Sequence, residues 1–193
     1  MPWYIYALLS TLFFAAQDLL MRVLAVKSDI PRVFSVVFNL WSAFFAILAF
    51  IIQGGSFHDL KNLTPINIIL IICAVVLYGF YERTHFSARK EVDASSFSII
   101  FRLTTVIAFI GSILFLHEFI TLNKFIGGSL IIGASFLLLY KNIKLKISRS
   151  FWLALLSALL LGIVLIIDKP ASASMQPALY SFIVWCFPIF IVA

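Results

Sequence analysis

Arg102 is the most unusual residue of the sequence, because it lies inside the apolar stretch Ile99-Ile100-Phe101-Arg102-Leu103-Thr104. An arginine at the middle of a membrane-spanning helix costs roughly 2.5–3.5 kcal/mol on insertion scales. Such a cation normally faces a cavity or a partner, where its chemistry is to bind an anionic group such as a carboxylate. The alternative is that Arg102 snorkels to the membrane surface, since it stands only about two turns from Ser95.

A second polar group, formed by Gln17, Asp18 and Arg22, falls late in the first apolar stretch. Asp18 and Arg22 are four residues apart, so they can pair on one face of a helix. Asp18 is the deeper of the two and therefore the costlier to bury. The functional interpretation is a gate pair, or a carboxylate that couples transport to protons. The structural interpretation is an ion pair that fixes the depth of a helix end, and it is favoured.

Tyr78, Tyr81, Glu82 and His85 have the spacing of a single helical face, at i, i+3, i+4 and i+7. That face could line the mouth of a cavity. The favoured alternative is an aromatic belt, in which tyrosine lies at headgroup level beside solvated charges. Asn39 is an isolated polar residue in the second apolar stretch, where a hydrogen bond to another helix is favoured over contact with a substrate.

The sequence contains no enzyme motif: it lacks His-Glu-x-x-His, Gly-x-Ser-x-Gly and a phosphate-binding glycine loop. The three histidines belong to different links without metal-ligand spacing, and Cys73 and Cys186 lie in apolar stretches, so neither a cofactor, a metal nor a disulfide is expected. Hydrophobic residues make up 63% and charged residues 11%, a composition that only a lipid environment accommodates. The net charge of +6 is therefore assigned to membrane topology, with membrane lipids rather than nucleic acid as the partner.

The elements that position these residues are expected to be membrane-spanning helices. Membrane-spanning strands would alternate apolar and polar residues, and these apolar stretches do not. The sequence predicts an all-α polytopic bundle. Its seven expected spans are Trp3–Leu24, Val33–Ile52, Pro65–Glu82, Ser96–Leu116, Asn123–Tyr140, Phe151–Ile167 and Ala178–Ala193.

An internal repeat divides the seven spans. Ala7-Leu8-Leu9-Ser10 recurs 147 residues later (154 − 7) as Ala154-Leu155-Leu156-Ser157. The expected units are a first five-helix repeat at residues 1–149 and the first two helices of a second repeat at residues 150–193. Because five is odd, the second unit would enter the membrane inverted, as in alternating-access transporters.

Lysine and arginine are strongly biased to one side of this topology, largely through the stretch from Lys141 to Arg149. The positive-inside rule makes that side cytoplasmic and places Met1 outside, although charges from further helices could reverse the orientation. A multi-pass protein of the plasma membrane, most simply a bacterial inner membrane, is expected.

Two motifs carry a family resemblance. Leu116-His117-Glu118-Phe119-Ile120-Thr121, followed by Phe125-Ile126-Gly127-Gly128-Ser129-Leu130-Ile131-Ile132-Gly133, resembles the signature that ends each half of EamA-type carriers in the drug/metabolite transporter superfamily. The resemblance implies a ten-helix carrier of small metabolites, amino acids or drugs. In members of that family the N-terminus usually lies in the cytoplasm. Glu118 suits a charged helix end. Gly127, Gly128, Ser129 and Gly133 are small residues that permit close helix packing.

Because the chain stops at Ala193 inside an apolar stretch, the sequence predicts a carrier truncated in its second repeat, which would not transport alone. One alternative is a non-transporting membrane partner that assembles as a homo- or hetero-oligomer. A less favoured alternative is a membrane-embedded enzyme, for which only Asp18, Glu82 and Arg102 are available.

Overall fold

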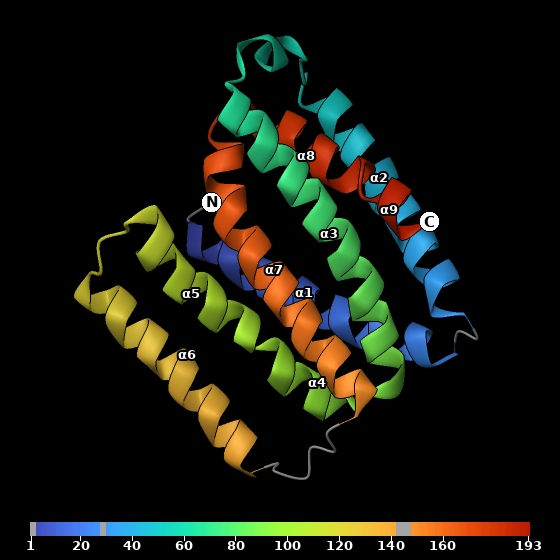
Figure 1. Cartoon of the computed structure of the whole chain (residues 1–193), viewed down its shortest axis with the longest axis vertical. Coiled ribbons are helices and arrows are strands. Elements are labelled where there is room, and N and C mark those ends of the chain that lie inside the picture. The colour runs from blue at the N-terminus through green and yellow to red at the C-terminus, as the bar shows by residue number, and fades with distance from the viewer. Residues whose placement is uncertain (1–2, 28–29, 142–147) are drawn as a thin grey trace.

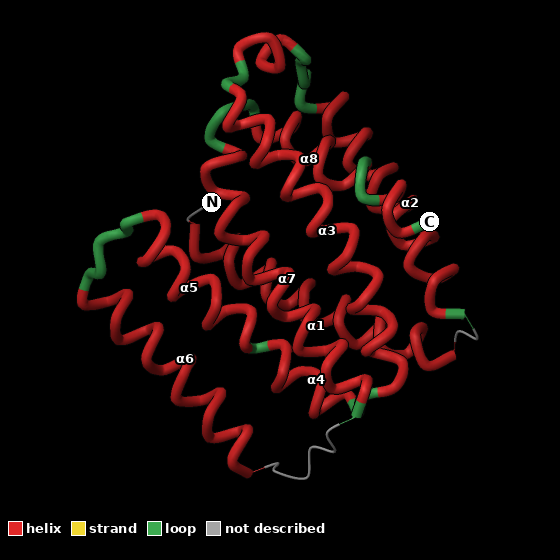
Figure 2. The backbone as a smooth tube through the Cα atoms, in the orientation of Figure 1, coloured by secondary structure: helices red, strands yellow, loops and turns green. Residues whose placement is uncertain are grey.

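We describe the fold from a computed structural model of the chain, which describes residues 3–27, 30–141 and 148–193. Within those ranges every regular element is a helix (Figures 1 and 2). The elements are α1 (Trp3–Lys27), α2 (Pro31–Ile52), the 3₁₀ helix η1 (His58–Asn62), α3 (Pro65–Glu91), α4 (Ala94–Phe101), α5 (Leu103–Leu116), α6 (Leu122–Lys141), α7 (Arg149–Ser172), α8 (Pro177–Cys186) and α9 (Ile189–Val192).

All seven predicted apolar stretches fall on helices, so the prediction of a polytopic helical bundle is confirmed. Five spans are long and apolar enough to cross a membrane: Tyr4–Lys27, Val33–Ile52, Pro65–Glu91, Ser96–Leu116 and Arg149–Ser172. The two remaining stretches, Leu122–Ala134 and Pro177–Val192, are shorter apolar helices. The protein is therefore an integral membrane protein by length and composition of its helices.

Helix α3 is longer than predicted, ending at Glu91 rather than at Glu82. It begins with Pro65 in its first turn, where the missing N–H is not needed, and the Thr64 side chain accepts from the Asn67 amide. The prediction stopped where polar residues begin. Several of the residues that follow, namely His85, Phe86, Ala88 and Arg89, are buried inside the protein, so the helix continues until Val92 adopts an extended conformation.

Two predicted spans are broken. The span Ser96–Leu116 divides at Arg102, whose amide donates to the carbonyls of Ser98 and Ile99, both at 3.2 Å, which tightens the turn between α4 and α5. The last span divides before α9, where Pro188 has no N–H to continue the hydrogen bonding of α8. Conversely, α7 passes through Pro170 without ending.

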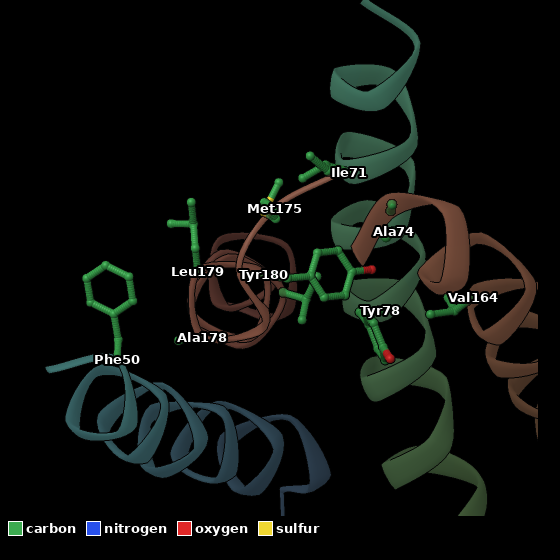
Figure 3. Close-up of a cluster of buried hydrophobic side chains, with 11 residues drawn as sticks. Phe50, Ile71, Ala74, Tyr78, Val164, Met175, Ala178, Leu179 and Tyr180 are labelled. Carbon is green, nitrogen blue, oxygen red and sulfur yellow. The ribbon is translucent and has the colours of Figure 1, made fainter. Parts of the chain in front are cut away.

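Helices α3 and α7 form the centre of the bundle and lie side by side (Figure 1). Helix α5 packs on α7, α2 packs on α8, and α1 lies against α3. Close approach of α5 and α7 depends on Gly162, where an added Cβ would lie 2.7 Å from Ile107 Cγ2. A buried apolar cluster fills the space between α2, α3, α7 and α8 (Figure 3).

Helices α1 and α7 run in opposite directions (Figure 1), which an inverted repeat requires. The repeat boundary and the superposition of its two units stay predictions. So does the orientation, because the basic residues Lys144 and Lys146 lie outside the described residues.

Candidate functional site

Arg89, near the end of α3, is the centre of a polar site between α1 and α3. Its side chain is only 5% exposed and forms an ion pair with Asp18 of α1. The guanidinium also donates to the Asp18 carbonyl oxygen at 2.9 Å. Its carbon atom Cζ lies 4.9 Å from the centre of the Phe97 ring of α4, which adds a cation–π contact. A buried cation is therefore paired, hydrogen-bonded and covered by an aromatic ring.

The geometry of α3 brings His85 into the same site. A long helical side chain lies back over the preceding turn, so Arg89 reaches the residue four positions earlier. Arg89 Nε donates to His85 Nε2 at 2.7 Å. Because Nε2 is the acceptor, the neutral imidazole carries its proton on Nδ1.

Arg22 stabilises the same region from α1. Its guanidinium donates to the carbonyl oxygens of Arg89 and Val92, at the carboxyl end of α3. A cation at that end complements the helix dipole and satisfies carbonyls that have no helical partner. Asp18 thus pairs with Arg89 across two helices, whereas the sequence suggested pairing with Arg22 within α1.

Glu82 and His85 complete the site and are almost fully buried, at 5% and 3% exposure. Glu82 Oε2 and His85 Nδ1 have no hydrogen-bond partner. Aromatic rings surround the imidazole, with centroids 4.9 Å away for Tyr81 and 5.0 Å for Phe101. The four-residue face predicted from spacing therefore exists and packs inside the protein, while its depth relative to the headgroups stays a prediction.

A second polar group lies between α3, α7 and α8. The Tyr78 hydroxyl donates to Asp168 Oδ2 at 2.6 Å, and the Tyr180 hydroxyl donates to Oδ1 of the same carboxylate. Figure 3 shows both tyrosine rings among the apolar side chains of this interface. Trp185 lies beside Tyr78, with ring centroids 5.7 Å apart. Asp168 is thus held between helices by two tyrosine hydroxyls.

A third polar group joins the α5–α6 loop to α7. Glu118 Oε2 accepts from Lys124 Nζ at 2.8 Å, and Oε1 accepts from Lys169. These two hydrogen bonds hold the pKa of Glu118 at about 2, below its ordinary value of 4.5. His117 precedes it in a left-handed conformation, with φ of 50°, and ends α5. The helix-end role predicted for Glu118 agrees with this placement.

The remaining predicted residues lie apart from these groups. Arg102 is exposed at the break between α4 and α5, and Gln17 is exposed on α1. Asn39 is 2% exposed, but its amide donates to the Ser35 carbonyl one turn earlier in α2, at 2.9 Å, rather than to another helix. A substrate contact at these residues stays a prediction.

The small residues of α6 differ among themselves. Gly128 packs on α5, since an added Cβ would lie 2.6 Å from the Phe109 ring. Gly127 and Gly133 face open space, and Ser129 is exposed. Of these four small residues, Gly128 packs closely against another helix of the described chain. Close packing at the other three positions stays a prediction.

Sequence reasoning missed Arg89, which it placed in a link between the third and fourth spans. The helical spacing that selected Tyr78, Tyr81, Glu82 and His85 continues to Arg89, four residues after His85. Extending that spacing beyond the apolar stretch would have found it.

A cavity of about 300 Å³ lies elsewhere, between α5 and α6. Its walls are mostly apolar, including Phe109, Ile113 and Ile131, and none of the predicted substrate-path residues lines it. Among the described residues no group of three or more metal-ligating side chains occurs. The concentration of buried charge makes the site around Arg89 the better functional candidate.

Comparison with known proteins identifies one family. Residues 1–140 match the model of the EamA-like transporter family, a range that ends within α6. No curated protein and no solved structure matches the chain.

Proposed function

Since the chain belongs to the EamA-like transporter family, we propose that it is a carrier which moves small molecules across a membrane by alternating access. The proposed substrates are small metabolites, amino acids or drugs, and the proposed location is the plasma membrane, most simply a bacterial inner membrane. The family consists of transporters rather than enzymes, which agrees with the absence of enzyme motifs from the sequence.

The polar site of Asp18, Glu82, His85 and Arg89, in which all but the half-exposed Asp18 are buried, is the observation that carries this proposal. A buried ion pair is weak evidence for stability, because well-packed apolar residues of similar volume often do as well or better. Ionisable groups within membrane-spanning helices usually mark the path of a substrate or ion. A network that joins α1 to α3 therefore supports a role in transport.

Helix α7 makes polar contacts at both of its ends. Its partners are α3 and the loop between α5 and α6, which belong to the first predicted repeat. At its beginning, Ser150 donates to Glu91 of α3. At its end, Asp168 contacts Tyr78 of α3 and Lys169 contacts Glu118. Ser150 and Asp168 are 18 positions apart (168 − 150), which corresponds to about 27 Å along the helix. Alternating access requires contacts at one end to open while those at the other remain closed, and this arrangement supports such a movement.

The substrate path is proposed to pass the α1–α3 site, with Asp18 and Arg89 as its charged groups and Arg22 holding the end of α3. Arg102 is proposed to bind an anionic part of the substrate when the α4–α5 break faces the path. Arg102 is exposed in the described chain, so a ligand could reach its guanidinium.

Transport by purified protein tests this function. The natural full-length protein is reconstituted in liposomes loaded with a mixture of amino acids, vitamins and drugs, and the compounds released are identified by mass spectrometry. Arg89→Gln removes the buried cation, whereas Arg83→Gln removes an exposed cation of the same helix and serves as the matched control. We expect release of one compound class by the wild type and the control, and loss of release by Arg89→Gln. Release no faster than from protein-free liposomes would contradict the proposal.

A further inference from the structure

Two buried polar atoms on α3 lack the hydrogen bonds that such atoms normally have. Glu82 Oε2 and His85 Nδ1 belong to residues three positions apart, hence to neighbouring positions on one helical face. More than nine-tenths of each residue is buried. Leaving a buried polar group unpaired costs about 1–3 kcal/mol, and more for a charged one, so each such group in a native structure calls for an explanation.

The neighbouring cation does not neutralise Glu82 by direct contact. Arg89 directs its guanidinium to Asp18 and its Nε to His85, so its hydrogen bonds lead away from the Glu82 carboxyl group. A carboxylate without a paired cation is much more costly to bury than a neutral carboxylic acid. The arrangement thus favours a proton on Glu82 in this conformation, while the ion pair of Asp18 and Arg89 is closed.

His85 connects the two groups. Its Nε2 accepts from Arg89, so its Nδ1 carries a hydrogen that has no acceptor. An ionised Glu82 would be an acceptor for that hydrogen, one turn away. With Glu82 ionised, the imidazole would donate to the carboxylate through Nδ1 while it accepts from Arg89 through Nε2.

We propose that Glu82 is a proton-binding site whose occupancy controls the ion pair between α1 and α3. With Glu82 protonated, Arg89 remains paired with Asp18. When the O–H bond of Glu82 breaks, its proton passes to water and the negative charge stays on the carboxylate. That carboxylate accepts from His85 Nδ1 and attracts Arg89, which weakens the pairing of Arg89 with Asp18. Coupling of this proton to substrate movement rests on the proposed function.

Within the described residues, the charged and titratable groups of the site that contains Glu82 come from α1 and α3. They are Asp18 and Arg22 from α1, and Tyr81, His85 and Arg89 from α3. Helix α4 contributes the aromatic rings of Phe97 and Phe101. On α7, Asp168 and Lys169 are engaged with Tyr78 and Glu118, away from this site.

Infrared spectroscopy tests the site without a substrate. The natural protein in lipid is taken through a series of pH values while the C=O stretch of protonated carboxylic acids is recorded. We expect one such band at neutral pH that disappears on raising the pH. It should be lost completely in Glu82→Gln and kept in Glu118→Gln, the control in which a carboxylate outside the membrane spans is removed.

Selective labelling keeps the test decisive if Glu82→Gln fails to fold. Wild-type protein made with glutamate carrying heavy carbon in its carboxyl group should show the band shifted. The other two glutamates of the sequence, Glu91 and Glu118, accept hydrogen bonds as carboxylates and should not contribute. A band unmoved by labelled glutamate, or absent at neutral pH, would overturn the assignment whether or not the protein transports.

The coupling is measured separately once a transported compound is known. Any exchange of that compound across liposomes by Glu82→Gln, which is fixed in the neutral form, should not vary with pH, whereas exchange by the wild type should. Accumulation by Glu82→Gln under an imposed pH gradient should fall to the level found without a gradient. Wild-type accumulation by Glu82→Gln would refute coupling through this proton, while loss of all exchange in the wild type would instead refute the proposed function.

Discussion

Separating Asp18 from Arg89 should reveal a measurable interaction between α1 and α3. The Arg89 side chain is 5% exposed and that of Asp18 is 51% exposed. Exposed ion pairs contribute about 0–1 kcal/mol, whereas breaking a fully buried pair costs about 3–5 kcal/mol. Because one partner is half in solvent, we expect an intermediate coupling of about 1–2 kcal/mol.

A double-mutant cycle measures this coupling. Asp18→Asn, Arg89→Gln and the combined variant are unfolded reversibly from mixed micelles by increasing the fraction of denaturing detergent. The coupling is the combined change in unfolding free energy minus the two single changes. Gln17→Ala changes an exposed neighbour of Asp18 and should alter stability by less than about 0.5 kcal/mol. If the two single changes simply add, Asp18 and Arg89 do not interact and the assignment of the site fails.

Three further predictions concern the other groups. Tyr180→Phe leaves one oxygen of Asp168 without its donor, so unfolding free energy should fall by about 1–3 kcal/mol; unchanged stability in the same detergent titration would contradict this hydrogen bond. The lysine contacts of Glu118 lower its pKa, so their stabilisation is present above pH 4.5 and lost as the pH falls towards about 2. Glu118→Gln should remove that loss from a pH titration of stability, and an unaltered profile would show that Lys124 and Lys169 do not stabilise the carboxylate. Arg102→Leu should abolish transport at unchanged membrane abundance, and wild-type transport would mean that Arg102 only snorkels.

The helices could be predicted because each apolar stretch is long, and the bilayer sets that length. Their ends were less predictable. Hydropathy falls after Glu82, but α3 continues because Glu82 and His85 are buried against other helices, which no local pattern reveals. The break at Arg102 has no proline or glycine to indicate it.

The site was predicted in part. The spacing within α1 and α3 placed Asp18 with Arg22, and Glu82 with His85, on shared helical faces, because helical periodicity is a local property. Which faces meet depends on tertiary packing. The pairing of Asp18 with Arg89, and of Asp168 with two tyrosines, joins residues 71, 90 and 12 positions apart, so sequence spacing carried no signal for these contacts.

Cross-linking α3 to α7 tests alternating access most directly. In a Cys73→Ser and Cys186→Ala background, Glu91→Cys and Ser150→Cys place two thiols where the side chains now share a hydrogen bond. Oxidation should join them and hold that end closed, so reconstituted protein should lose transport and regain it on reduction. Each single cysteine variant should be unaffected by the oxidant. Transport at the wild-type rate by fully cross-linked protein would contradict a carrier in which α3 and α7 separate at this end.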